Sequence, residues 1–334
     1  MTQVWPVPPG QVAATGIGSL PGTDPRESAR LVLGELPDLP FLPELPARGP
    51  HADLTGRTCA LLADLHVDLQ PSGWRITARP SRDGSRARDL LARDLDALEE
   101  TEAHPTLLKV QAAGPWTLAA AVELSKGDRV LADHAAVADL AASLAEGLSQ
   151  HLADLSRRFP GTALLLQLDE PGLPTVLAGQ VPTASGFGRL RTPERQTAVE
   201  RLRTVLSAAD HTVVHCCAPQ PPVSLITEAG AGGVSVDGAL LTRRDDDDLG
   251  EAIEKGMRLL LGMVPGVDAD LSDLTGRMRI ATELWRRLGF PPERLTEVLI
   301  VTPSCGLAGA SPSYARNALQ ACVELARRLG EEPA

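Results

Sequence analysis

Short apolar runs alternate with segments of helical periodicity along most of this 334-residue sequence. The apolar runs are rich in Val, Ile and Leu and predict strands at 12–17, 107–110, 163–168, 212–215, 233–236, 258–262 and 297–302, with a weaker one at 41–45. The helical spacing predicts helices at 26–36, 86–98, 134–158, 193–208, 249–255, 271–288 and 314–329. Because strands that alternate with helices form a parallel sheet with the helices outside, this α/β pattern predicts a (β/α)8 TIM barrel.

The chain shows no internal repeat, low-complexity linker or sharp change in composition that would divide it. We therefore expect a single domain, with the barrel over residues 12–330 and an N-terminal extension of unassigned role over residues 1–11. The first helix has a well-marked start, since Asp24 can cap it, Pro25 suits its first position and Glu27 has the capping-box spacing. The irregular stretch 37–81 is expected to carry an extra hairpin.

The charge balance restricts the kind of partner. With 32 Lys and Arg against 43 Asp and Glu, the net charge of −11 argues against a nucleic acid or an anionic membrane. No apolar run reaches the roughly 18 residues that a membrane span needs, and the N-terminus does not resemble a secretory signal. Five cysteines are too few and too unevenly spaced for a disulfide scaffold, so we expect a reducing, cytoplasmic setting.

The strongest chemical signal lies where a predicted strand ends in a histidine followed by two thiols. Residues i and i+2 of an extended chain face the same way, so His215 and Cys217 would project together and Cys216 would face the other side. Cys305 and Asp237 follow two other predicted strands. The carboxyl ends of strands are where barrel active sites form, and N, S, S and O donors suit tetrahedral Zn²⁺.

These residue types also have purely structural interpretations. Asp237 can cap the turn that follows its strand instead of binding a metal. Cys59 and Cys322 are expected in the core, because cysteine is among the most often buried residues. A disulfide between the neighbours Cys216 and Cys217 would distort the backbone, so we do not expect one.

The glycine-rich loop GIGSLPG at 16–22 follows the first predicted strand. Its third glycine is displaced from the dinucleotide-binding spacing and Pro21 removes a backbone donor, so we do not expect a Rossmann site. Gly18 and Ser19 can instead bind a small carboxylate through backbone N–H groups and the serine hydroxyl. The alternative is a tight turn without a ligand.

Two acids, Asp169 and Glu170, end another apolar strand. One of them can bind a substrate ammonium group at the barrel mouth, or can form an ion pair with a basic loop. Trp116 follows a further strand and can line a pocket or pack within its loop. The acidic run 245–248 is typical of a solvated helix N-terminus.

Taken together, these segments resemble the catalytic barrel of cobalamin-independent methionine synthase. The resemblance spans residues 12–329, and its motifs occur in the family's order: IGSLP at 17–21, GPWTL at 114–118, QLDEP at 167–171, HCC at 215–217 and PSCGL at 303–307. A His-x-Cys pair with a distant Cys-Gly-Leu after the last strand is rare. Members of the family have two barrels, and similarity to the C-terminal one alone implies a short, core form of the enzyme.

The resemblance implies a zinc site. His215, Cys217 and Cys305 match the family's zinc ligands. Asp237 stands where the family has its remaining ligand, a glutamate that is one methylene longer. Zn²⁺ would favour the thiolate form of a substrate thiol, and a weak oxygen ligand such as Asp237 would leave as that thiolate enters.

The resemblance also implies an amino-acid substrate, homocysteine. Gly18 and Ser19 match the loop that receives its carboxylate, and Asp169 matches the acid that receives its amino group. For the family's second substrate-binding acid the candidate is Asp68. A family histidine that helps proton transfer has no equivalent within 262–270.

The implied activity is that of a homocysteine S-methyltransferase of the methionine synthase type. The two-barrel enzymes take the methyl group from a polyglutamylated methyl-folate with help from their N-terminal barrel. We expect a methylated corrinoid here, either methylcobalamin or a corrinoid protein, with methyl-folate as the other possible donor.

Three other functions stay open at this point. Related zinc barrels alkylate coenzyme M, although Ser19 and Asp169 favour an amino-acid thiol. The uroporphyrinogen decarboxylases are distantly similar, metal-free barrels, and the three metal-type residues argue against that activity. A binding protein with a closed structural zinc site is the third.

Overall fold

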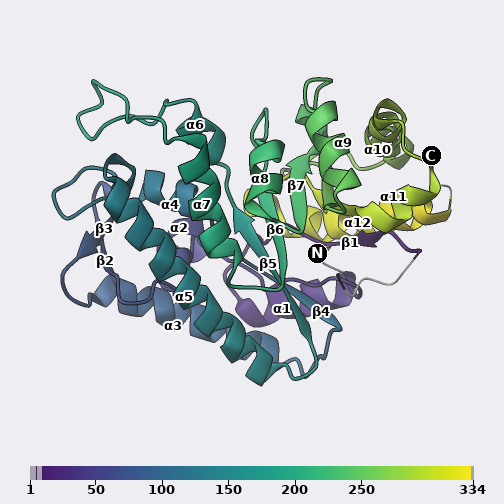
Figure 1. The fold of residues 1–334 in the computed structure, drawn as a ribbon. Helices are drawn as coiled ribbons and strands as arrows, with labels where there is room; N and C mark the ends of the chain where they lie inside the picture. The colour runs from purple at the N-terminus through teal and green to yellow at the C-terminus, as the bar shows by residue number, and fades with distance from the viewer. Residues whose placement is uncertain (1–4, 6–9, 332–334) are drawn as a thin grey trace.

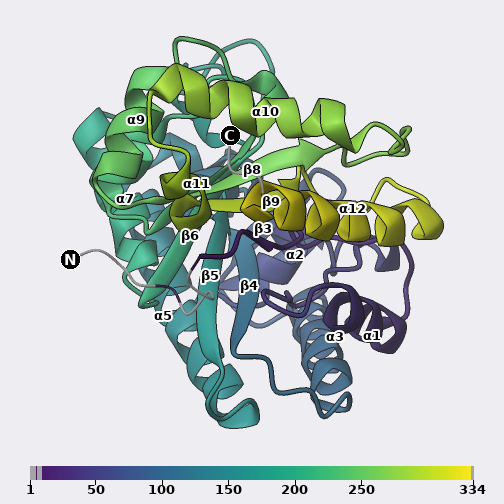
Figure 2. The same cartoon turned by 90° about the vertical axis from the view of Figure 1, so that its right-hand side faces the viewer.

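A computed structural model describes Trp5 and residues 10–331. Its main sheet has seven parallel strands in the order β1-β9-β8-β7-β6-β5-β4, and the strands turn progressively around the sheet (Figures 1 and 2). These strands are β1 (Ala13–Ala14), β4 (Leu107–Ala113), β5 (Ala163–Asp169), β6 (His211–Cys216), β7 (Gly233–Asp237), β8 (Arg258–Val264) and β9 (Leu299–Pro303). Each predicted strand from 107 onward is confirmed.

Helices follow the strands and cover the outside of the sheet, as α5 and α7 do in Figure 1 and α10 and α12 in Figure 2. They are α1 (Pro25–Glu35), α2 (Leu54–Cys59), α3 (Arg82–Glu99), α4 (Pro115–Ala121), α5 (His134–Arg158), α6 (Leu173–Leu177), α7 (Arg195–Leu206), α8 (Val223–Ala229), α9 (Asp246–Glu254), α10 (Leu274–Leu288), α11 (Glu293–Val298) and α12 (Pro312–Glu331). Asp24 caps α1 as predicted, accepting hydrogen bonds from the backbone N–H groups of Arg26 and Glu27. Within the described residues, no helix is both long and apolar enough to cross a membrane.

The segment 40–45 takes the eighth position of the barrel. Phe41 pairs in parallel with Lys109 of β4, and Glu44 pairs with Ser19 in the loop after β1. Four backbone hydrogen bonds of 2.9–3.0 Å support these two bridges. The weak strand predicted at 41–45 is thus present as isolated bridges, because the prolines on either side of it remove backbone donors. The predicted (β/α)8 architecture is confirmed, with seven regular strands and one irregular one.

The barrel interior is apolar at the amino ends of the strands and becomes polar towards their carboxyl ends. Trp5, from the N-terminal extension, packs on the apolar layer formed by Ala13, Leu39, Leu107, Leu165, Val213, Leu260 and Ile300. The extension's residues 1–4 and 6–9 lie outside the described part of the chain. Because inward-facing residues recur every second position, the next layer contains Lys109, Gln167 and His215. The buried polar side chains of the barrel interior therefore lie near the carboxyl ends of the strands.

A separate two-stranded hairpin lies in the irregular stretch 37–81, as the sequence predicts. Its strands β2 (His66–Gln70) and β3 (Gly73–Thr77) are antiparallel. Arg75 of β3 forms an ion pair with the buried Glu123 (2.7 Å), which attaches the hairpin to the segment after α4.

Candidate metal centre and amino-acid pocket

A cluster of metal-binding side chains lies at the carboxyl ends of β6 and β9. The ligand atoms of His215, Cys217 and Cys305 all lie within 4.8 Å of one another, and the two Sγ atoms are 3.2 Å apart. His215 and Cys217 face the same way, as their i, i+2 spacing predicts, while Cys216 is fully buried in the core. In the described part of the chain, this is the one cluster of three such side chains close enough to hold a metal ion.

A hydrogen bond with the neighbouring strand fixes the orientation of the His215 ring. Its Nδ1 lies 2.9 Å from the hydroxyl of Ser235, a fully buried residue of the neighbouring strand β7. Its Nε2 is buried and has no hydrogen-bond partner among the described residues. A buried ring nitrogen without a partner is costly, and a hydrogen bond to the other nitrogen is the usual way in which proteins orient a histidine that binds metal. The nitrogen and two thiols therefore suit a metal ion such as Zn²⁺.

The two thiols differ in acidity. The pKa of the Cys305 thiol is lowered to about 4. The largest cause is the hydrogen bond with Cys217, and the second is the nearby imidazole of His215. The same hydrogen bond, together with burial, raises the pKa of Cys217. Cys305 is therefore the more acidic thiol of the pair, and a thiolate is the form that binds metals.

Asp237 lies beside this cluster as the last residue of β7. Its Oδ1 accepts a hydrogen bond from the backbone N–H of Ala239 (3.0 Å) and so caps the short turn that follows. Burial raises its pKa, and Cys305 and His215 are among the charges that act on it. The structure brings Asp237 near the three ligands but not into their cluster.

The metal cluster opens into a cavity of about 340 Å³, a volume that suits a small molecule. Gly18 and Ser19 line this cavity together with Asp169, so the residues expected to bind the two ends of an amino acid share one space with the thiols. The loop carrying Ser19 is held against the loop after β9, because the carbonyl of Ser19 accepts a hydrogen bond from the N–H of Leu307 (2.8 Å).

Gly18 is required by its surroundings. Its φ of +155° lies in the region that favours glycine, and a Cβ there would lie 2.7 Å from Cγ of Gln111. The close approach of Gln111 explains why a glycine precedes Ser19.

Asp169 is buried at the end of β5 and faces the cavity. Its Oδ1 accepts a hydrogen bond from Nε2 of Gln167 (2.8 Å). Burial raises its pKa to about 6, and the charges of His215 and Lys109 oppose this rise. A cationic group that enters the cavity would favour the ionised form of this acid.

A second buried acid, Glu44, also lines the cavity and was missed from the sequence. Burial raises its pKa to about 7, an effect that Arg57 opposes from 3.6 Å and the negative charge of Asp169 increases. Asp68, the candidate for this second acid, lies on β2 and is not among the residues that line the cavity, whereas Glu44 is. The weak strand 41–45 was the signal that could have located Glu44, since it places this residue near a carboxyl end.

The remaining candidates have structural roles. Trp116 is buried, with its Nε1 donating to the carbonyl of Ala198 (3.0 Å), and so packs within the fold. Glu170 accepts hydrogen bonds from the N–H groups of Trp116 and Thr117 at the start of α4. Cys59 and Cys322 are buried in the core, as expected.

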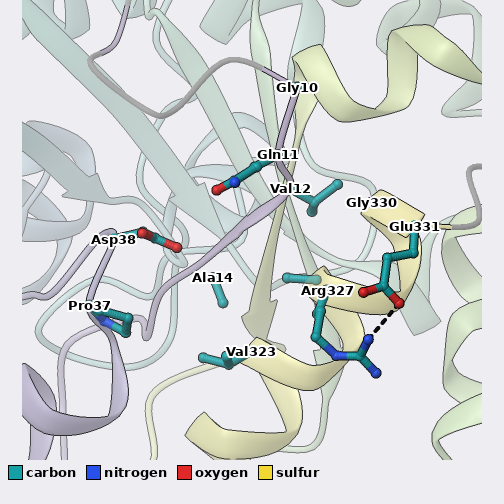
Figure 3. A pocket seen from close by; sticks show the side chains of 11 residues that line it. Gly10, Gln11, Val12, Ala14, Pro37, Asp38, Val323, Arg327, Gly330 and Glu331 are labelled. Carbon is teal, nitrogen blue, oxygen red and sulfur yellow. Dashed lines mark hydrogen bonds and ion pairs between the residues drawn. The ribbon is translucent and has the colours of Figure 1, made fainter.

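A second cavity, of about 370 Å³, lies at the opposite, amino-terminal end of β1, between this strand and α12 (Figure 3). Arg327 and Glu331 there are ion-paired with each other. The described residues that line it include neither a thiol nor a histidine. The cavity beside His215 is therefore the candidate site.

The chain is similar to known proteins in sequence and in fold. Residues 12–328 match the family model described as cobalamin-independent synthase, catalytic domain. A B12-independent methionine synthase from Shewanella sp. W3-18-1, solved in complex with selenomethionine, has a similar fold, with a TM-score of 0.60 and 11% identity over 96% of this chain and 98% of that one. A methyltransferase from Methanosarcina mazei gives a TM-score of 0.63 and 16% identity over 96% of this chain and 95% of that one. No curated protein matches the chain.

Proposed function

Because this chain belongs to the family of cobalamin-independent methionine synthase catalytic domains, we propose that it is a zinc-dependent homocysteine S-methyltransferase that forms methionine. One observation carries the proposal: a His/Cys/Cys cluster and two buried acids open into the same cavity. A thiol and an ammonium group of one small molecule can therefore be bound side by side. Because thiol ligands need a reducing compartment, we expect the enzyme to act in the cytoplasm.

The metal would be held by Nε2 of His215 and by the thiolates of Cys217 and Cys305. When bound, Zn²⁺ supplies Lewis acidity that favours the thiolate form of a substrate thiol at neutral pH. Ser235 fixes the ring of His215 so that Nε2 faces the thiols. We propose Asp237 as a weak further oxygen ligand, since it lies at the edge of the cluster.

The remaining polar groups of the cavity suit the two ends of an α-amino acid. Asp169 and Glu44 present carboxylates to the ammonium group, and their burial strengthens this attraction. Ser19 and the backbone after Gly18 offer donors to the carboxylate. Binding at both ends fixes the direction of the sulfur, so that methyl transfer becomes a positioned displacement.

We also propose that the methyl donor is a methylated corrinoid, either methylcobalamin or a corrinoid protein. The cavity of about 340 Å³ suits an amino acid and is too small to enclose such a donor as well. Cys305 is exposed at the mouth of the cavity, which supports a donor that is presented to the site from outside.

The first experiment measures zinc in the purified protein and its X-ray absorption spectrum before and after addition of homocysteine. Stoichiometric zinc that gains a sulfur ligand is the expected result. The matched variants are Cys217→Ala, which should lose the zinc, and Cys216→Ala, which should keep it because that neighbouring thiol points into the core. A protein without zinc, or with zinc unchanged by the thiol, would contradict the proposal.

The second experiment compares methyl donors with homocysteine as the acceptor. Turnover with methylcobalamin supports the corrinoid donor, whereas turnover with methyl-folate alone would refute it. Coenzyme M is the control acceptor, and we expect it to react poorly because Asp169 and Glu44 would repel its sulfonate.

A further inference from the structure

A fully buried lysine lies beneath the cavity without lining it. Lys109 projects from β4 into the barrel, and its Nζ lies 2.8 Å from the carbonyl of Ile17, 2.8 Å from Oε1 of Gln167 and 3.4 Å from Oε1 of Gln111. Burial lowers the pKa of Lys109 to about 7, and the charges of Asp169 and Glu44 oppose this fall. In its ammonium form the group has three donors, so each of its protons meets one oxygen here. The ring of Phe41, whose centroid is 5.3 Å away, adds a favourable face for a cation.

The ammonium group determines how the amide of Gln167 is turned. The ammonium form of a lysine donates and cannot accept, so Gln167 presents its oxygen to Lys109. Its Nε2 then faces the other way and donates to Oδ1 of Asp169 and to the carbonyl of Ile17, both at 2.8 Å. Lys109 therefore orients, through one amide, an acid that lines the cavity.

Gln111 makes an equivalent connection on the other side. Its oxygen faces Lys109, and its Nε2 donates to the carbonyl of Leu42 at 2.5 Å. Leu42 lies two residues before Glu44 in the irregular eighth segment, which has few backbone hydrogen bonds of its own to fix it.

The three branches end on three of the segments that supply polar groups to the cavity. Ile17 precedes Gly18 and Ser19, Gln167 is bonded to Asp169, and Leu42 leads to Glu44. These segments are far apart in the sequence and converge on one nitrogen atom. The side chain of Lys109 thus links the part of the cavity suited to a carboxylate with the two acids suited to an ammonium group.

We propose that Lys109 is a positioning residue that sets the spacing between Ser19, Asp169 and Glu44, and so makes the cavity selective for an α-amino acid. The identity of that amino acid as homocysteine rests on the proposed function. The connections themselves do not depend on it.

The test replaces the cation with a neutral side chain of similar length, Lys109→Met. We expect KM for homocysteine to rise by at least about tenfold, since buried acceptors lose their donor and the amide of Gln167 is free to turn. Bound zinc should stay stoichiometric, because Lys109 does not contact the metal cluster. Arg258→Met is the matched control: it removes a half-buried cation from the amino end of β8 and should leave KM unchanged.

Crystal structures of the wild type and Lys109→Met provide a readout that needs no turnover. We expect the amide of Gln167 to rotate and the carboxylate of Asp169 to move by about 0.5 Å or more, a displacement that matters for a preorganised site. If the wild type does not use homocysteine, the proposed function fails and this structural comparison still tests the positioning role.

Three results would overturn the inference. One is an unchanged KM together with an unmoved Gln167 amide in a folded Lys109→Met protein. Another is loss of zinc along with the change in KM, which would indicate a general structural role. If Lys109→Met does not fold, Gln167→Leu removes the branch to Asp169 alone, and a KM equal to that of the wild type would then refute the proposal.

Discussion

Removal of one hydroxyl group behind the metal cluster should weaken metal binding without touching a ligand. Ser235 is fully buried on β7, and its Oγ lies 2.9 Å from Nδ1 of His215. In Ser235→Ala the imidazole loses the partner that fixes its tautomer and its orientation. Such partners are typically worth 10- to 100-fold in metal affinity, which corresponds to about 1.4–2.7 kcal/mol.

The assay is competition for zinc between the protein and a chromogenic chelator at fixed pH. Ser143→Ala is the matched control, since Ser143 is also a buried serine whose hydroxyl has one partner, the carbonyl of Ala63, far from the cluster. Both variants should lose a similar amount of stability, about 1 kcal/mol for one hydrogen bond, and Ser235→Ala alone should lose zinc affinity. A zinc affinity of Ser235→Ala within about twofold of the wild type would refute the reasoning, because the hydrogen bond would then have no part in orienting the ligand.

Three further predictions concern the cavity beside His215 and the apolar layer at the amino ends of the strands. Gly18→Ala should raise KM for homocysteine by about tenfold and spare zinc, because its Cβ would displace Gln111; an unchanged KM would count against the tight fit. Trp5→Ala should lower the free energy of unfolding by about 3–5 kcal/mol in thermal or urea denaturation, and a loss below about 1 kcal/mol would show that the indole does not stabilise the apolar layer. Because the pKa values of Asp169 and Glu44 are raised to about 6 and about 7, both acids gain protons as the pH falls from about 8 to about 6, so affinity for the amino acid should fall over this range. A flat profile of KM against pH would argue that these acids do not bind the ammonium group.

The strands that the sequence predicts well are those that are buried on both faces. From β5 to β8 the runs are mostly apolar, as is typical of parallel strands covered by helices, and their predicted ends lie within two residues of the observed ones. The first strand is different: the sequence predicts 12–17, and β1 covers Ala13–Ala14. The reason lies in distant residues, because the carbonyl of Ile17 accepts hydrogen bonds from Lys109 and Gln167 in place of a strand partner.

The pairing of His215 and Cys217 in the cluster could be predicted because its signal is local. A histidine and a thiol two residues apart on one strand must face the same way, whatever the rest of the chain does. Glu44 carries no such signal. Its environment is made by Arg57 and Asp169, which come from other parts of the chain, and the prolines around it weaken the pattern of the strand predicted at 41–45. Short helices such as α6 were missed for a related reason, since five residues do not establish a helical period.

Asp237 is the candidate ligand for which the sequence and the structure differ. The resemblance puts it in the fourth ligand position, whereas its Oδ1 caps the turn at Ala239 and its carboxylate lies outside the three-residue cluster. Asp237→Asn keeps an oxygen for that cap and removes the charge. We expect it to lower zinc affinity by less than about tenfold and to keep zinc stoichiometric, because the cluster of His215, Cys217 and Cys305 supplies most of the binding. The comparison is with Cys217→Ala in the same chelator competition, and a loss of zinc from Asp237→Asn as complete as from Cys217→Ala would mean that the carboxylate is a full ligand.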